Sequence, residues 1–468
     1  MNIGRIERVT KSGPKIVYDS EPNSLIALDG TEERARTPGN ATATGPQWPK
    51  PLATEAFHGL AGDIVESILP HTESSEAALL IQTLICFGNV IGRSAYFVAE
   101  ASRHFANLFA VLVGVTSVAR KGSSWAQVLR VFRMVDSEWA ERQLQSGLSS
   151  GEGLIWAVRD PITKREPIRE HGRVVDYQDI EVDAGISDKR ALIFEGEFAS
   201  PLKMMAREGN TLSVLVRQAW DTGDLRTMTK NSPARATGAY ISIVGHVTRD
   251  ELRRELNSTD LANGFANRIL WICTTRSKEL PEGGDLSDHE IDPLVSRLKD
   301  AVTFARNIGE MKRDDAIRNM WADTYHELTA GTPGLLGAVT SRAVPQTMRL
   351  ACLYALLDRS GVVRAEHLLA GIALWEYCHA SAKFIFGDAL GDPTADAILR
   401  GLRDAQVGLD RTSISSLFSR HAAASEISRA LSVLQEHGLA EVSRGSQDAA
   451  GRPCEVWSAV GSTAKRAK

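Results

Sequence analysis

The chain has 468 residues, of which 43% are hydrophobic and 24% charged, a composition typical of a globular protein with two or three domains. This composition excludes a fibrous or largely disordered protein. The formal net charge of −4 gives no overall attraction to nucleic acid, so any DNA contact has to come from a local basic patch. None of the five cysteines forms a C-x-x-C pair, which argues against a disulfide framework or a zinc site and indicates a cytoplasmic protein.

Residues 1–50 are rich in Thr, Gly and Pro and predict a disordered arm or linker. Apolar residues then recur at helical spacing up to about residue 100. The longest apolar stretch, residues 77–92, contains Gln82 and Asn89. It is too short and too polar to span a bilayer, so it predicts a buried helix, and we expect no contact with membranes.

Four short runs are continuously apolar, apart from Ser242 in the third, which is typical of strands buried on both faces of a parallel sheet. They cover residues 108–113, 191–194, 240–244 and 269–273. Helical patterns separate several of these runs, and this alternation predicts an α/β core over residues 51–285. The polar residues 160–190 predict a hairpin or surface insertion, and residues 286–390 predict a helical subdomain.

A glycine-containing loop follows the first of these strands. Residues 114–124 have the sequence GVTSVARKGSS and precede a helical pattern, as in loops that wrap phosphates with backbone N–H groups. The usual spacing G-x-x-x-x-G-K-[ST] is not met, because Ala119 and Arg120 occupy the Gly and Lys positions. A loop one residue longer would place Lys121 on the phosphates of ATP, and Ser123 or Ser124 on Mg²⁺. The candidate nucleotide ligands are Gly114, Thr116, Arg120, Lys121, Gly122, Ser123 and Ser124.

The alternative for this loop is a plain strand–turn–helix connection with a solvated Arg–Lys pair.

Two carboxylates end the second strand, where a nucleotide-hydrolysing site needs one acid near the metal and one that activates water. We assign Glu195 to the metal together with Ser123, and Glu197 to the general base. These two acids could instead be exposed at a turn. After the third strand, Thr248 and Glu251 predict a capping box.

Two further segments supply basic residues. Arg268 precedes the fourth strand and is either an arginine finger for a neighbouring subunit or a structural arginine paired with an acid. Arg226 and Lys230 lie in a polar segment after the second helical pattern. They could grip DNA phosphates in the pore of a ring, or belong to a solvated hairpin.

The last 75 residues predict a separate module. Three helical patterns and two strand patterns within residues 394–460 look like a winged helix, followed by a tail at 461–468. Ser425 and Arg429 of the third helix would face the major groove of DNA, and Arg444 and Arg452 would flank the wing or lie on it. The module carries ten basic and eight acidic residues, and winged helices also bind proteins. DNA binding and protein docking therefore both remain open.

Residues 50–385 resemble a family of P-loop ATPases of phages, plasmids and integrated elements, of unknown function and associated with primases and helicases. Six motifs carry the resemblance: ARKGSSW (119–125), SSGEGLI (149–155), EGEFA (195–199), REGNTLSVLVRQAWD (207–221), NGFANRILW (263–271) and SRAVPQTMRLACLYAL (341–356). The family shares the RKG departure from the usual loop spacing. The resemblance implies a RecA-like core, ATP and Mg²⁺ as cofactors, and a homo-oligomeric ring such as a hexamer.

We therefore expect an ATP-dependent, helicase-like protein that acts on DNA in the replication of a mobile element. DNA and a primase or another replication protein are its expected partners. The alternative is a DNA-binding initiator, loader or regulator that does not hydrolyse ATP. The chain lacks a G-x-G-x-x-G signature, which argues against an NAD enzyme.

Overall fold

The structure is a computed structural model that describes most of the chain from residue 47 to residue 460. The described ranges are 47–114, 119–171, 173–228, 234–256, 260–261, 263–332, 334–387, 392–405, 407–419, 421–436, 438–444 and 455–460. Of the predicted site residues, Thr116, Lys230 and Arg452 lie outside these ranges, as do almost all of the predicted N-terminal arm and the predicted tail.

A five-stranded parallel sheet with helices on both faces forms the centre of the α/β part. Its strands are β3 (Phe109–Gly114), β4 (Leu144–Gln145), β7 (Arg190–Glu195), β10 (Tyr240–Thr248) and β11 (Ile269–Thr274). They lie in the order β11-β3-β10-β7-β4, which is 5-1-4-3-2 when they are numbered along the chain. All four predicted strands are confirmed. The two-residue strand β4 is too short to leave an apolar signal in the sequence.

The continuous apolarity of the strands is explained by burial of both sheet faces. Alternate residues of each strand enter two different hydrophobic clusters: Leu112 and Val244 belong to one, Val111 and Ile243 to the other. Because side chains alternate across a strand, a sheet covered on both sides needs apolar residues at every position. Most polar side chains of these strands therefore lie at the strand ends, and the buried Ser242 and His246 inside β10 are exceptions.

The first face is covered by a layer of helices around α2 (Glu76–Ile91), whose residues 77–91 are all buried, as its sequence predicted. The helices that share this cluster are α1 (Gly59–Ile68), α3 (Lys121–Val135), α4 (Ser137–Arg142), α10 (Asp288–Ala305), α13 (Ala343–Leu357) and most of α14 (Ala365–Phe386). Helices from residues 286–390 thus share one hydrophobic core with the sheet. Also in this part are η1 (Thr54–Phe57), α11 (Arg318–Thr329) and the strand pair β12 (Lys312–Arg313) and β13 (Val362–Val363).

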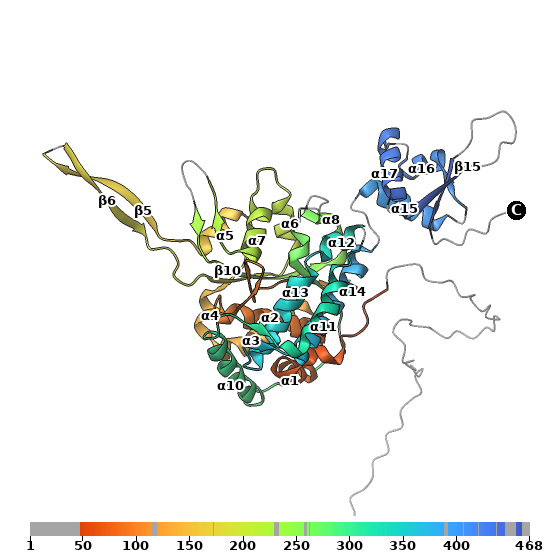
Figure 1. Cartoon of the computed structure of the whole chain (residues 1–468). Helices are drawn as coiled ribbons and strands as arrows, with labels where there is room; N and C mark the ends of the chain where they lie inside the picture. The colour runs from red at the N-terminus through yellow and green to blue at the C-terminus, as the bar shows by residue number, and fades with distance from the viewer. Residues whose placement is uncertain are drawn as a thin grey trace, which may run out of the picture. The chain divides into compact units, whose positions relative to one another are not determined.

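The opposite face is covered by shorter helices and by the last turns of α14. These helices are α5 (Gly151–Ala157), α6 (Ala199–Met205), α7 (Leu212–Asp221), α8 (Arg249–Glu255) and α12 (Gly334–Thr340). Three antiparallel hairpins lie outside the sheet: β1 (Tyr96–Ala99) with β2 (Ser102–Phe105), β8 (Leu225–Arg226) with β9 (Arg235–Ala236), and β5 (Ile162–Glu170) with β6 (Arg173–Asp183). The last is the predicted insertion; it is largely exposed and projects from the helices and sheet (Figure 1).

The C-terminal module has a hydrophobic cluster of its own. It contains three helices, α15 (Pro393–Asp404), α16 (Arg411–Leu417) and α17 (Ala424–Glu436), and an antiparallel sheet of β14 (Leu409–Asp410), β15 (Ala440–Arg444) and β16 (Glu455–Ala459). Ile398, Leu402, Ile414, Leu431 and Trp457 are buried in its core. The three predicted helices and two predicted strands are confirmed, and the short strand β14 is an addition.

Within the described ranges, no helix is both long and apolar enough to cross a bilayer. The long buried helix α2 meets the sheet through the polar side chain of Asn89. The Asn89 amide nitrogen donates to Ala191 O (3.1 Å) and to Ser242 Oγ (3.2 Å), and its oxygen accepts from Trp139 Nε1 (2.8 Å). All four residues are buried. These bonds fix the position of α2 along β7 and β10.

Replacing Asn89 with Leu should lower the free energy of unfolding by about 1–3 kcal/mol, because buried partners such as the Trp139 N–H lose their hydrogen bonds. Urea denaturation followed by circular dichroism measures the change. Asn319→Leu, at an exposed position of α11, is the matched control and should change stability little. Equal effects of the two substitutions would contradict the role given to Asn89.

Candidate functional site

The predicted loop residues lie at the carboxyl edge of the sheet. Gly114 ends β3, and its register partners are Thr248 of β10 on one side and Thr274 of β11 on the other. The carboxyl ends of these three neighbouring strands therefore meet at one place. In open α/β sheets, the crevice outside the carboxyl ends of the strands is where ligands bind.

The helix α3 begins at this edge with Lys121 as its first residue. Gly122 and Ser123 are exposed in its first turn, while Ser124 is buried and its hydroxyl donates to Lys121 O (2.7 Å). A Cβ at Gly122 would meet no atom within 4 Å. Among the residues that the structure describes, the start of α3 therefore leaves space at Gly122 and a hydroxyl without a partner, that of Ser123, at the strand ends.

The two adjacent cations of the loop have different environments. Arg120 immediately precedes α3, and its Nε lies 2.6 Å from Glu73 Oε2. Lys121 has no ion pair or hydrogen bond to its ammonium within the described ranges. Partial burial lowers the pKa of Lys121, and the nearby Glu251 carboxylate opposes that effect. Lys121 is therefore the loop cation that is free to meet a ligand.

Two residues of β10 and α8 face Lys121. His246 is buried, and burial together with the Lys121 charge lowers its pKa to about 3, so the imidazole is neutral at neutral pH. Its Nε2 lies 3.0 Å from Gln82 Nε2. Glu251 forms the predicted capping box with Thr248, whose Oγ1 donates to Glu251 Oε2 (2.8 Å). The sequence indicates only the cap for Glu251, since its place beside Lys121 depends on the pairing of β10 with β3.

The two acids after β7 differ in availability. Glu195 is buried, and its Oε1 accepts a hydrogen bond from Leu148 N (2.6 Å). Because side chains alternate along a strand, Glu195 points to the sheet face opposite that of Phe194, which stacks on Trp125 of α3. Glu197 is exposed at the turn before α6 and has no side-chain hydrogen bond or ion pair within the described ranges. Of the two, Glu197 is the carboxylate that is free for chemistry.

Arg268 is held within its own chain. It is buried, and its guanidinium binds Asp221 through two bonds, Nη2–Oδ2 (2.6 Å) and Nε–Oδ1 (3.2 Å). It also donates to Gly264 O, and it precedes β11, at the end of that strand away from Lys121. An arginine finger has to be exposed to reach a neighbouring subunit. The geometry therefore favours the structural interpretation of Arg268, and its assignment as an arginine finger stays a prediction.

Three of the predicted DNA-contacting residues are exposed. Arg226 lies on β8 and pairs with Arg235 across the hairpin. Ser425 and Arg429 lie on α17, and Arg429 Nη1 is 2.6 Å from Asp392 Oδ2. The Arg429 side chain of this ion pair is 59% exposed. A fourth residue, Arg444, is the last of β15 and pairs with Glu455 in the register of the sheet.

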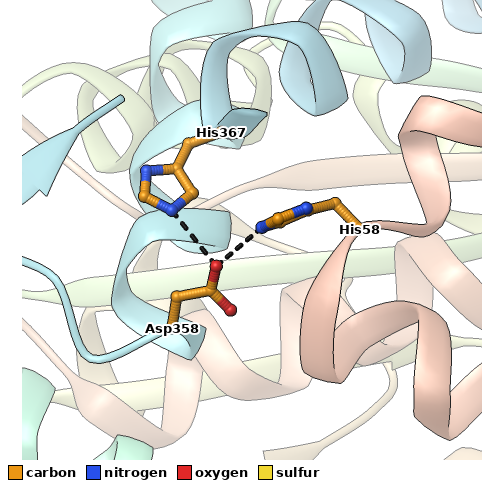
Figure 2. A group of neighbouring side chains, drawn as sticks. All are labelled: His58, Asp358 and His367. Atoms are coloured by element: carbon orange, nitrogen blue, oxygen red, sulfur yellow. Dashed lines mark hydrogen bonds and ion pairs between the residues drawn. The ribbon is translucent and has the colours of Figure 1, made fainter. Parts of the chain in front are cut away.

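A second group of titratable residues lies in the helical layer, where His58, Asp358 and His367 offer ligand atoms within 4.8 Å of one another. Figure 2 shows both imidazole rings turned toward the Asp358 carboxylate. His58 precedes α1, Asp358 follows α13, and His367 lies in the first turn of α14. The Nε2 atoms of His58 and His367 are 2.6 Å and 3.2 Å from Asp358 Oδ2.

The hydrogen bonds of His367 argue against a metal in this group. The backbone N–H of Arg364 donates to His367 Nδ1 (3.0 Å). A neutral imidazole whose Nδ1 accepts a hydrogen bond carries its proton on Nε2, so His367 Nε2 donates to Asp358 and has no lone pair for a metal. The hydrogen bonds of this group therefore connect the start of α1 to the turn between α13 and α14.

No family model and no curated protein matches the sequence.

The hydrogen-bonded group of His58, Asp358 and His367 makes a pH-dependent contribution to the stability of the fold. Burial raises the pKa of Asp358, but hydrogen bonds from His367 and His58 outweigh it, and the net pKa lies below the ordinary value. A carboxylate with a lowered folded-state pKa stabilises the fold above its unfolded pKa of about 4, and this contribution is lost as the pH falls through the folded value.

Asp358→Asn should therefore lower the free energy of unfolding by about 1 kcal/mol at pH 7, after allowance for the exposure of the carboxylate. The difference from the parent should shrink as the pH is taken below about 4. Melting temperatures across pH measure both effects. Asp315→Asn removes an exposed carboxylate paired only with Arg318 in the described structure, and it is the control. A loss at Asp358 that did not depend on pH would contradict the assignment.

Proposed function

We propose that the chain is an ATP-binding, helicase-like protein that acts on DNA in the replication of a mobile genetic element. The observation that supports this proposal most is the position of Lys121, which begins a helix at the carboxyl edge of a parallel sheet. Within the described ranges, this lysine has no ion-pair partner. The start of a helix and a lysine ammonium both attract nucleotide phosphates. The loop sequence that resembles the P-loop ATPase family surrounds this residue.

Three features of the edge fit a bound nucleotide. The space around Gly122 lets phosphates approach the first turn of α3. Thr274 Oγ1 is buried without a hydrogen-bond partner within the described ranges, beside Gly114 in the sheet. Ser123 is the better candidate for the metal, because the Ser124 hydroxyl is already used by Lys121 O. Mg²⁺ bound with ATP would supply charge neutralisation on the phosphate oxygens.

The strand order supports a RecA-like core. The order 5-1-4-3-2 differs from the 3-2-1-4-5-6 order of dinucleotide-binding folds. It is the order expected of the RecA-like fold that the family resemblance implies. It also places β10, with His246, between the strand of the loop and the strand that ends in Glu195 and is followed by Glu197. In this proposal Glu197 accepts a proton from the attacking water, and the chain assembles into a ring.

The second candidate function is a DNA-binding initiator, loader or regulator that holds ATP without hydrolysing it. Two observations favour it. The Glu195 carboxylate accepts the Leu148 N–H, and Arg268 is committed to Asp221. A hydrolytic site would then lack both an acid close to the metal and an arginine finger. Steady-state ATP turnover with and without single-stranded DNA separates the two candidates.

The C-terminal module supports the DNA-acting part of the proposal. Three helices followed by an antiparallel β15–β16 pair fit a winged helix, in which the third helix enters the major groove. Ser425 and Arg429 lie on exposed positions of that third helix, α17. The hairpin with Arg444 and Arg452 would be the wing. The resemblance to primase-associated proteins makes a replication protein the expected protein partner.

Lys121→Ala should weaken Mg-ATP binding by about tenfold or more, because it removes a charge-assisted hydrogen bond to a phosphate. Isothermal titration calorimetry on the full chain measures this change. Lys299→Ala, on an exposed position of α10, is the matched control and should bind ATP as the parent does. Parental affinity in Lys121→Ala would show that the loop is not the nucleotide site.

The triple substitution Arg429→Ala, Arg444→Ala and Arg452→Ala should reduce the affinity of the full chain for duplex DNA. It should also flatten the salt dependence of binding by about one unit of log–log slope for each phosphate that the variant no longer neutralises. Fluorescence anisotropy of a labelled duplex at several salt concentrations tests both points. Arg400→Ala, an exposed arginine on α15 of the same module, is the control. Unchanged affinity and slope would favour protein docking as the role of the module.

A further inference from the structure

The residue before α3 has an unusual backbone conformation. Arg120 has φ 50° and ψ 29°, in the left-handed region that residues with a side chain rarely adopt. Its carbonyl accepts hydrogen bonds from Ser123 N (3.1 Å), Ser124 N (3.2 Å) and Ser74 Oγ (3.3 Å). Strained residues of this kind persist only where their surroundings hold them in place, and they cluster at binding sites.

Glu73 holds the side chain of Arg120. It lies shortly before α2, and its carboxylate is only 12% exposed. Oε2 lies 2.6 Å from Arg120 Nε, and Oε1 accepts from Arg276 Nη2 and from Leu280 N (2.8 Å). The Glu73 carbonyl also accepts from Ser277 N (2.9 Å). One carboxylate thus joins the start of α3 to the segment that follows β11.

The charges of this group favour the pairing of Glu73 with both arginines. The hydrogen bond from Arg276 is the largest of several effects that hold the pKa of Glu73 below its usual range, so Glu73 is ionised at neutral pH. Both of its oxygens are used, one by each guanidinium. Arg120, whose side chain is 47% exposed, therefore has a carboxylate partner, whereas Lys121, which follows it directly, has none within the described ranges.

We propose that Glu73 is a positioning residue that withholds Arg120 from the nucleotide and leaves Lys121 as the phosphate-binding cation. The inference rests on the proposed function. At the usual spacing after Gly114, Arg120 stands where the phosphate-binding lysine belongs. The Glu73–Arg120 pair moves that role one residue along the chain, so the loop binds phosphates although its spacing is irregular. The ligand class is a nucleoside triphosphate, whose oxyanions would otherwise compete with Glu73 for Arg120.

The test compares Mg-ATP binding by calorimetry in four forms of the full chain: Lys121→Ala, Glu73→Gln, the double variant and the double variant with Arg120→Gly added. Glycine is chosen at position 120 because it tolerates a φ of 50°. Lys121→Ala should bind about tenfold or more weakly than the parent. In the double variant Arg120 is released and should restore most of the missing affinity. The triple variant should bind weakly again.

The outcomes separate this inference from the function on which it rests. Parental affinity in Lys121→Ala would overturn the proposed nucleotide site itself. A weak Lys121→Ala that Glu73→Gln weakens further, or leaves unchanged, would overturn the role of Glu73 and leave the nucleotide site standing. A purely structural role for Glu73 predicts this second result, because removing a structural ion pair cannot restore binding.

A single variant keeps the inference testable if Glu73→Gln does not fold. Arg120→Gly removes the guanidinium and keeps the backbone conformation. Since Glu73 already keeps Arg120 away from the phosphates, Arg120→Gly should reduce ATP affinity far less than Lys121→Ala does. Equal reductions in these two variants would show that Arg120 binds the phosphates directly, and the inference would be wrong.

Discussion

Burial of the parallel sheet on both faces is the constraint on which the other features depend. A strand covered from both sides has no position for an unpaired polar side chain, so chemistry can occur only where a strand ends. The ends of β3 and β10 carry Gly114 and Thr248, and α3 begins directly beyond them. The same constraint explains why the polar exceptions inside the layers, such as Asn89 and Gln82, are hydrogen-bonded to groups of the sheet.

Charge pairing distinguishes structural cations from available ones. Arg120, Arg268 and Arg429 all have carboxylate partners at 2.6 Å. The burial of the three guanidinium side chains differs: Arg268 is only 8% exposed, whereas Arg120 and Arg429 are 47% and 59% exposed. Lys121 has no such partner within the described ranges. We therefore expect a negatively charged ligand to bind Lys121 in preference to any of the three arginines.

Polar contacts between distant segments hold the helical layer in register. Asn89 ties α2 to β7 and β10, and Asp358 ties the start of α1 to the turn before α14. Gly59 belongs to the second contact, because its φ is +59° and a Cβ there would come within 2.6 Å of Asp358 Oδ1. Glu73, which lies just before α2, reaches the start of α3 through its ion pair with Arg120. The helical layer thus contributes directly to the shape of the candidate site.

Local sequence determined the four strands, the buried helix α2 and the three helices of the C-terminal module, because apolar periodicity reflects the burial of each element. It also located the loop around Lys121 and the capping box at Thr248, whose signals lie within a few consecutive residues. The tertiary structure decided the strand order, the pairing of Arg120 with Glu73, the pairing of Arg268 with Asp221 and the approach of Glu251 to Lys121. Each of these contacts joins residues from separate elements. The spacing of charged residues along the chain does not indicate which distant residue each of them will contact in the folded protein.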